Sequence, residues 1–255
     1  KIVFNFAKEV FSTFDLCLVA NKESKKNLSE LQVKNLKYIG NLKYSAQNIL
    51  EQLEDSNKRN LDNYKTWCAA STHAGEELIV LKAHVEIKKI HNNVLTIIIP
   101  RHINRVFYIK NLSKKLNLKS QILNDNDRIE SNIEILIINS FGVLPKYFNY
   151  CKNIFIGKSF IKKKQNVSGQ NPIEAAKLGC KIFHGPFVYN FQEVYERLND
   201  YGFTEKVTNE FELADKIIKR FKSQTAIDQQ RVNSLNSYGE KILKETVLEI
   251  SEYLN

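Results

Sequence analysis

The chain has 255 residues, of which 43% are hydrophobic, so it can bury one sizeable core or two smaller ones. This composition excludes a disordered chain and a collagen-like repeat. The 38 basic and 28 acidic residues give a formal charge of +10, which suits nucleic acid, anionic lipid or a phosphorylated substrate without distinguishing among them.

Short β-branched runs alternate with longer amphipathic segments along the whole chain. This alternation predicts an α/β fold with a mostly parallel, Rossmann-like sheet, right-handed crossovers and helices on both faces. A polar segment from Ser45 to Lys65 is expected to form a solvated helix, and residues 209–255 are expected to form two closing helices. The expected strands are Asp15 to Ala20, Trp67 to Ala70, Val94 to Ile99, Ile133 to Ile138, Asn153 to Gly157 and Lys181 to His184, and the main expected helices are Gly75 to Ile90, Asn104 to Leu116, Pro172 to Leu178 and Phe191 to Tyr201.

The composition shifts predict three parts. Residues 1–40 are expected to be the end of an amino-terminal domain or a connecting strand and helix, residues 41–208 a nucleotide-binding domain, and residues 209–255 carboxy-terminal helices. Because the sequence begins at Lys1 and contains no methionine, we expect a fragment of a longer protein. Neither an apolar run of about 18 residues nor a signal peptide is present, so no membrane-spanning or secretory segment is expected in it.

The four cysteines lie far apart and form no Cys-x-x-Cys pair. They are Cys17, Cys68, Cys151 and Cys180, and three of the four lie in or beside apolar runs. This pattern is typical of reduced, buried thiols in a cytosolic protein and indicates no metal site.

Three loops share one design, in which a β-like run ends in small or polar residues before a helix begins. Exposed backbone N–H groups at such a helix start can bind an anion. The first is Ser71-Thr-His73, followed by Glu76 and Glu77 in the first turn of the expected helix, where the helix dipole favours acidic residues. The second is Pro100-Arg-His102. In the third, Asn171 is expected at the N-cap, Pro172 at the first helical position and Glu174 at the third. Glu174 either completes a capping box or accepts hydrogen bonds from ribose hydroxyls beside a phosphate at the helix start.

Individual side chains in these loops have two interpretations each. Arg101 has the fork geometry that binds phosphate or carboxylate, and its alternative is a surface ion pair. His73 is either a ligand contact or a structural histidine bonded to a backbone carbonyl. The loop Asn139-Ser-Phe-Gly-Val143 again follows a strand, and Lys158 and Lys162 to Lys164 form a basic segment before Gly169. Because the other lysines are spread over many helices, nucleic-acid binding is not expected.

Taken together, these loops resemble the 3-deoxy-D-manno-octulosonic acid (Kdo) transferases of lipopolysaccharide synthesis, which are glycosyltransferases of the GT-B type. The match keeps the order and spacing of the family from about Phe14 to Tyr201. The matching residues are Gly40 to Lys43, Trp67, Ala69 to His73, Gly75 to Glu77, Pro100 to His102, Arg105, Phe141, Gly142, Gly169, Asn171 to Ala175, Gly185, Pro186, Asn190 and Phe191.

The resemblance implies the carboxy-terminal, donor-binding half of such an enzyme, with cytidine monophosphate-Kdo (CMP-Kdo) as donor and a lipid A precursor as acceptor. It implies no cofactor and no metal ion, and it places the general base in the amino-terminal domain, so that this fragment holds no catalytic residue and is expected to be inactive alone. The implied location is the cytoplasmic face of the bacterial inner membrane, with peripheral contact to its anionic surface or an anchor in the amino-terminal part. The expected donor contacts are Pro100, Arg101, Phe141, Gly142, Val143, Asn171, Pro172, Ile173 and Glu174, and the candidate contacts to the donor sugar are Ser71, Thr72, His73 and His102.

The chain departs from the family at three places. Val143 stands where the family usually has Glu, Gln170 stands where it usually has His, and Gly157-Lys-Ser159 replaces a common Gly-Gly-Ser. These departures predict altered donor affinity or sugar choice. Two alternatives remain open at this point: a GT-B-like nucleotide-sugar epimerase, and a non-catalytic nucleotide-binding relative.

Overall fold

The fold is described from a computed structural model, which describes residues 2–47, 53, 55–161, 168–223 and 229–254. The chain forms two compact units, each described separately below. One comprises residues 1–47 and 233–255, and the other comprises residues 48–232. Division of the parent protein into domains at residues 40 and 208 stays a prediction.

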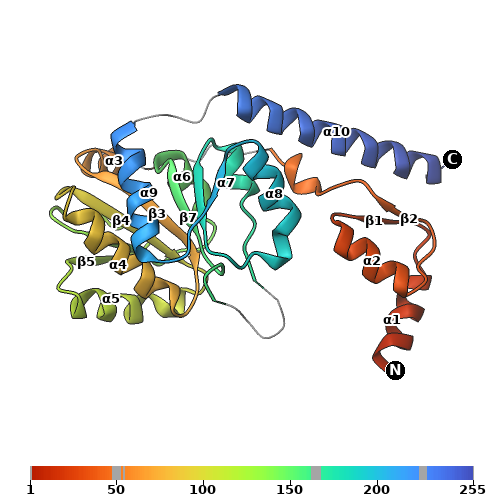
Figure 1. The fold of residues 1–255 in the computed structure, drawn as a ribbon, viewed down its shortest axis with the longest axis horizontal. Coiled ribbons are helices and arrows are strands. Elements are labelled where there is room, and N and C mark those ends of the chain that lie inside the picture. Colours follow the sequence, from red (N-terminus) through yellow and green to blue (C-terminus); the bar gives the residue numbers. More distant parts are fainter. Residues whose placement is uncertain (1, 48–52, 54, 162–167, 224–228, 255) are drawn as a thin grey trace. The chain divides into compact units, whose positions relative to one another are not determined.

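The larger unit is built on a seven-stranded, wholly parallel sheet with the order β5-β6-β4-β3-β7-β8-β9 (Figure 1). The predicted α/β fold with a parallel sheet is therefore confirmed. The strands are β3 (Lys65–Thr72), β4 (Val94–Pro100), β5 (Ser120–Leu123), β6 (Ile135–Ile138), β7 (Asn153–Ile156), β8 (Lys181–His184) and β9 (Thr204–Lys206).

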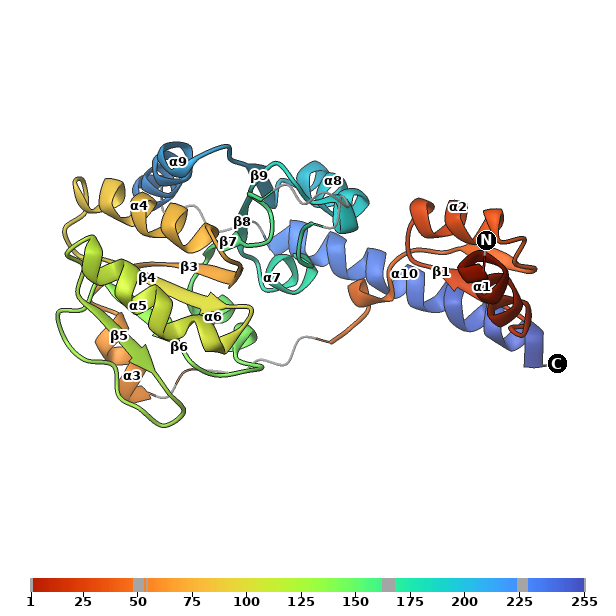
Figure 2. The same ribbon diagram turned by 90° about the horizontal axis from the view of Figure 1, so that it is seen from below.

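Helices cover the sheet on both faces (Figures 1 and 2). Helix α4 contacts both α5 and α9, and α6 contacts α7. Every residue of β4 is buried, as expected for a central strand of a sheet covered on both sides. The helices of this unit are α3 (Asp55–Leu61), α4 (Glu76–Lys88), α5 (Val106–Lys115), α6 (Leu144–Tyr150), α7 (Ile173–Lys177), α8 (Gln192–Asp200) and α9 (Glu210–Ser223), with 3₁₀ turns η2 (Ile103–Arg105) and η3 (Tyr189–Phe191).

The predicted solvated helix over Ser45 to Lys65 is wrong in extent and in character. Within the described residues of this segment, only Asp55–Leu61 are α-helical, and Lys65 already begins β3. Leu61 is completely buried, and the Asn57 side chain holds the chain near Ile129 by accepting from its N–H (2.9 Å). Polar composition therefore concealed a helix that is anchored on one side.

The smaller unit contains a two-stranded parallel sheet, β1 (Cys17–Val19) and β2 (Leu36–Tyr38), joined through α2 (Lys22–Glu30). Asn21 caps α2 by accepting from the Ser24 N–H (2.7 Å). Helix α1 (Ile2–Ser12) precedes this pair, and η1 (Leu42–Tyr44) follows it. The predicted strand over Asp15 to Ala20 and the helix after it are confirmed.

The last helix, α10 (Gln229–Leu254), contributes residues from 233 onward to the smaller unit. A Cβ at Gly239 would lie 2.1 Å from the Tyr44 carbonyl oxygen, so the close approach of this helix to η1 requires glycine there. The Tyr44 and Tyr238 rings meet edge to face, 5.2 Å apart. Among the described residues, no helix has the length and apolarity to cross a bilayer.

Candidate functional site

The loops that follow the strands lie together at the carboxyl edge of the parallel sheet. From β3 the chain proceeds outward through β4 toward β5 and β6, and then returns to the other side of β3 to form β7. The connections therefore change direction between β3 and β7. Open α/β sheets bind ligands outside the carboxyl ends of their strands at such a switch point.

The buried Glu76 side chain lies at this switch point. The residue is at the first position of α4, and its side chain is completely buried. Oε2 accepts from the backbone N–H groups of His73 (2.9 Å) and Lys158 (2.6 Å), and Oε1 accepts from those of Ser159 (2.7 Å) and Phe160 (3.0 Å). The sequence indicated only that Glu76 favours the positive end of the helix dipole.

This arrangement corrects one sequence-based expectation. The loop after β3 was expected to offer free N–H groups to an external anion. Its His73 N–H instead donates to Glu76, as do three N–H groups of the loop after β7. The chain's own carboxylate thus takes the place that an anionic ligand would take. Any phosphate bound at this edge must use other donors.

The loop after β7 is tightly constrained. A Cβ at Gly157 would lie 2.5 Å from the Ser71 carbonyl oxygen, so no side chain fits between the two loops. Lys158 has a φ of 58°, a left-handed conformation that disfavours residues with a Cβ. Its carbonyl oxygen accepts from the Gly169 N–H (2.6 Å) and the Ser168 hydroxyl (2.7 Å). The Ser159 hydroxyl oxygen accepts from the Gly185 N–H (2.8 Å) and thereby ties this loop to the end of β8.

The loops after β3 and β4 are joined through backbone groups and bring two of the predicted site histidines, His73 and His102, together. The Arg101 N–H donates to the Thr72 carbonyl oxygen (3.0 Å), and the Arg101 side chain is exposed. The rings of His73 and His102 meet edge to face, 5.7 Å apart. His73 Nδ1 lies 3.0 Å from the Ser71 carbonyl oxygen, which can only accept, so Nδ1 carries the proton and Nε2 is left as an acceptor. Burial lowers the pKa of His73.

Several predicted contacts have side chains that solvent does not reach. The Thr72 side chain is completely buried, and Val143 and Ile173 are also buried. Pro100 and Pro172 are buried as well. In this conformation such residues present mainly backbone groups to a ligand, and their role as donor contacts stays a prediction.

The loop after β6 presents Phe141 to solvent, with 68% of its surface exposed, and Gly142 has a φ of 75°. This loop is held to the loop after β5: the Asn139 amide donates to Asn124 Oδ1 (2.8 Å), and the Ser140 hydroxyl donates to Asp125 Oδ1 (2.7 Å). A cavity of about 400 Å³ lies beside these two loops, between Asp125, Ser140, Lys146 and other residues.

The turn that leads into α7 differs by one position from the prediction. The helix begins at Ile173, and Pro172 takes the cap position that was predicted for Asn171. The Asn171 side-chain oxygen still accepts from the Ile173 N–H (3.1 Å), so the residue caps the helix from one position earlier. Glu174 is exposed. Because α7 has five residues, its dipole is small, and anion binding here would depend on individual N–H groups.

Glu77 and Arg105 form a second buried contact near this edge. The Glu77 side chain is completely buried and receives Arg105 Nε (2.7 Å) and Nη2 (3.1 Å) in a two-point pair. The hydrogen bond to Glu77 raises the pKa of Arg105. This pair fixes the start of α4 against η2, directly after the Arg101 turn.

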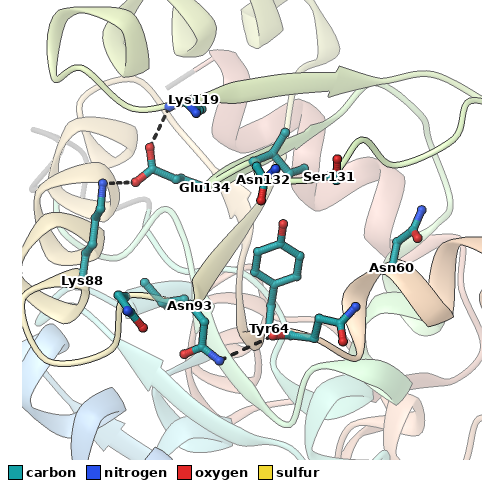
Figure 3. A pocket seen from close by; sticks show the side chains of 12 residues that line it. Asn60, Tyr64, Lys88, Asn93, Lys119, Ser131, Asn132 and Glu134 are labelled. Carbon is teal, nitrogen blue, oxygen red and sulfur yellow. Dashed lines mark hydrogen bonds and ion pairs between the residues drawn. The ribbon is translucent and has the colours of Figure 1, made fainter.

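A second cavity, of about 530 Å³, lies at the opposite, amino edge of the sheet (Figure 3). None of the predicted site residues lines it. Its charged groups already interact with one another: Lys88 pairs with Glu134, and Glu134 also accepts from the Lys119 N–H (2.9 Å). Within the described part of the chain, no cluster of three or more His, Cys, Asp or Glu residues could hold a metal ion.

Sequence reasoning missed Glu76, Gly157 and Ser159 as the residues that join the loops. Their partners lie as much as 84 residues away in the chain, so local pattern carries no signal for them. The sequence did identify most of the loops that they join.

Comparison with known proteins shows which enzymes the chain is similar to. No family model matches it. It is 25% identical over 231 residues to the 3-deoxy-D-manno-octulosonic acid transferase of Aquifex aeolicus. That alignment covers 90% of this chain and 61% of the relative. The enzymes of the same name from Haemophilus influenzae and Rickettsia conorii are 29% and 26% identical, covering 64% and 98% of this chain and 38% and 53% of those relatives. The chain thus spans about half the length of the curated relatives that it matches.

Solved structures show the same fold. The C-terminal CMP-Kdo binding domain of WaaA from Acinetobacter baumannii superposes with a TM-score of 0.59 at 21% identity, covering 74% of this chain and 94% of that domain. A glycosyltransferase from Rickettsia africae gives 0.56 at 15% identity, covering 98% and 65%, and the UDP complex of S. aureus MnaA gives 0.55 at 13% identity, covering 96% and 62%. The resemblance to the Kdo transferases that the loop motifs indicated is therefore confirmed.

Proposed function

We propose that this chain is the donor-binding half of a Kdo transferase and that it binds CMP-Kdo at the carboxyl edge of its seven-stranded sheet. The observation that carries the proposal is that, within the larger unit, the loop motifs shared with Kdo transferases meet at one edge of one sheet. The similarity to curated Kdo transferases over as much as 98% of the chain supports it.

The proposed reaction transfers Kdo from CMP to a hydroxyl of a lipid A precursor. The acceptor oxygen attacks the anomeric carbon, the bond from that carbon to the phosphate oxygen breaks, and CMP leaves with the electron pair. The hydroxyl proton passes to a base that we place in the amino-terminal half of the parent protein. This chain alone is then expected to bind donor without transferring sugar.

The leaving phosphate gains negative charge as the bond breaks, so donors fixed before the reaction stabilise the transition state more than the ground state. Arg101 suits this role because its side chain is exposed while its backbone is pinned to Thr72. The N–H groups that bind Glu76 are already used, which leaves the Arg101 side chain and the turn before α7 as the proposed phosphate contacts. Glu174, exposed in the first turn of α7, is the proposed ribose contact.

Calorimetric titration with CMP tests the proposal. We expect the chain to bind CMP, and we expect Arg101→Ala and Glu174→Ala each to weaken binding by about 1 to 3 kcal/mol, which is roughly 5- to 150-fold. Lys89→Ala, which removes a charge at the far end of α4 beside Glu86, serves as the control and is expected to bind like the unaltered chain. A folded sample that shows no binding at millimolar CMP would contradict the proposal.

UDP is the informative competitor because an epimerase shares this fold. A putative UDP-N-acetylglucosamine 2-epimerase from Listeria monocytogenes superposes with a TM-score of 0.54 at 14% identity, which shows the fold alone. Binding of UDP in preference to CMP would favour the epimerase class. If the parent protein with its amino-terminal half binds CMP yet transfers no Kdo, the non-catalytic alternative is favoured.

We also propose that the parent protein works at the cytoplasmic face of the bacterial inner membrane, in peripheral contact with anionic lipid. The charge of +10 supports this, because each Lys or Arg near an anionic leaflet contributes about 1 kcal/mol. Cosedimentation with anionic vesicles at low salt, lost at high salt and with zwitterionic vesicles, is the expected result. Salt-independent or absent binding would remove this part of the proposal for the present chain.

A further inference from the structure

Glu76 links two turns that the proposed function assigns to the donor. Its carboxylate accepts from the His73 N–H on the loop after β3, and from the N–H groups of Lys158, Ser159 and Phe160 on the loop after β7. These loops follow neighbouring strands, paired from Cys68 with Ile154 to Ala70 with Ile156, but they are more than 80 residues apart in the chain.

On one side, the link reaches the Arg101 turn in two steps. Glu76 holds the His73 N–H, and the carbonyl of the preceding residue, Thr72, accepts from the Arg101 N–H (3.0 Å). Thr72 and Pro100 are also register partners in β3 and β4. The position of the Arg101 backbone therefore depends on the segment that Glu76 holds.

On the other side, the link reaches the turn before α7. Glu76 holds the Lys158 N–H, and the Lys158 carbonyl oxygen accepts from the Gly169 N–H (2.6 Å) and from the Ser168 hydroxyl (2.7 Å). Gly169 lies two residues before Asn171. Its φ of 92° and a Cβ position only 3.0 Å from Val188 leave this turn little freedom to move.

The contact needs a carboxylate. Two oxygens with four acceptor sites match four N–H donors, whereas a glutamine would turn its own NH₂ group toward two of them. The site has no room for adjustment, because a Cβ at Gly157 would lie 2.9 Å from Glu76 Oε2 and 2.7 Å from the Thr72 Cα. Glutamine would therefore leave buried N–H groups unpaired and push the two loops apart.

Building on the proposed function, we propose that Glu76 is a positioning residue for donor binding, which sets the separation between the Arg101 turn and the Gly169 to Glu174 turn. Glu76 does not touch the donor in this arrangement, since its oxygens are buried and occupied by backbone donors. It acts by holding the groups that bind the phosphate and the ribose at a fixed spacing.

The test compares Glu76→Gln with Glu77→Gln in the same chain. The two glutamates are adjacent and equally buried, but Glu77 binds the Arg105 side chain instead of the loop backbone. Calorimetry with CMP is carried out well below the unfolding temperature of each variant, and backbone amide exchange is measured in parallel. We expect Glu76→Gln to lose at least tenfold in CMP affinity, with faster exchange at Lys158, Ser159, Phe160 and Gly169, and Glu77→Gln to stay within threefold.

Unchanged CMP affinity in folded Glu76→Gln, or an equal loss in Glu77→Gln, would overturn the inference. If Glu76→Gln does not fold, Glu76→Asp replaces it, since the charge is kept while the shorter side chain reaches fewer N–H groups. The expected result is then an intermediate loss of affinity with the same local exchange pattern. Should the unaltered chain bind no CMP, the proposed function fails, and the exchange rates of the four loop amides still decide whether Glu76 holds the two turns together.

Discussion

His84 is expected to make the larger unit lose stability as the pH falls from 7.5 to 5. The residue lies in α4 and is completely buried, with Nδ1 2.8 Å from the Thr96 hydroxyl oxygen in β4. Nε2 has no hydrogen-bond partner among the described residues and lies 4.0 Å from Glu134 Oε1. Burial lowers the pKa of His84 to about 4, while Glu134 opposes this shift and Lys88 adds to it.

The direction of this change in stability follows from the difference in proton binding between the folded and unfolded states. Because the folded pKa lies below the value of 6.5 in an unfolded chain, the unfolded state binds the extra proton first. The stabilisation is complete above pH 6.5 and is lost as the pH falls toward 4. With an unfolded pKa of 6.5 and a folded pKa of about 4 for His84, the loss in free energy of unfolding at pH 5 is RT ln[(1 + 10^1.5)/(1 + 10^−1)], or about 2 kcal/mol.

The measurement is urea unfolding followed by the fluorescence of Trp67, the single tryptophan, which lies completely buried in β3 of the same unit. Between pH 7.5 and 5, the unaltered chain should lose about 2 kcal/mol more free energy of unfolding than His84→Gln, which cannot take up this proton. His184, whose pKa burial also lowers to about 4, titrates in both proteins and cancels.

Titration of Glu134 does not contribute to the change between pH 7.5 and 5. Burial alone would raise the pKa of Glu134, but hydrogen bonds from Lys88 and from the Lys119 N–H outweigh it and lower the pKa. Its titration therefore falls below the range used. If both proteins lost stability in parallel between pH 7.5 and 5, the burial argument for His84 would be refuted.

Three further outcomes test the packing around the candidate site. Lys158→Gly should raise the free energy of unfolding by up to about 1 kcal/mol. The strain of a left-handed residue with a Cβ, about 1 to 2 kcal/mol, is removed, and this gain exceeds the cost of the added chain entropy of glycine. A lower free energy of unfolding in urea would show that the Lys158 side chain is needed. Arg105→Ala should destabilise by about 3 kcal/mol because it leaves the buried Glu77 unpaired, and adding Glu77→Gln should recover part of the loss in the same assay. Iodoacetamide should modify only Cys17 in the native chain, because Cys68, Cys151 and Cys180 are buried and burial raises the pKa of each of these three thiols. Intact-protein mass spectrometry that detects more than one added group would contradict this.

Much of the fold could be predicted because its pattern is local. The alternation of β-branched runs with amphipathic segments identified five of the seven strands of the large sheet and, from these, the parallel arrangement. The two missed strands, β5 and β9, are short edge strands with polar residues, and they lack the continuous apolar run that marks a central strand. Helix α6 was missed for a related reason, since seven residues after Gly142 are too few for a clear helical period.

The candidate site shows where local pattern stops. Strand ends meet at one edge in any parallel sheet, so the sequence by itself determined which loops gather there and that Arg101 lies on one of them. Only the tertiary structure decided that Glu76 turns inward and that its four donors come from two loops. The physical reason is that a buried carboxylate takes its partners from whatever backbone lies nearest in space, and those groups are set by strand pairing across more than 80 residues of chain.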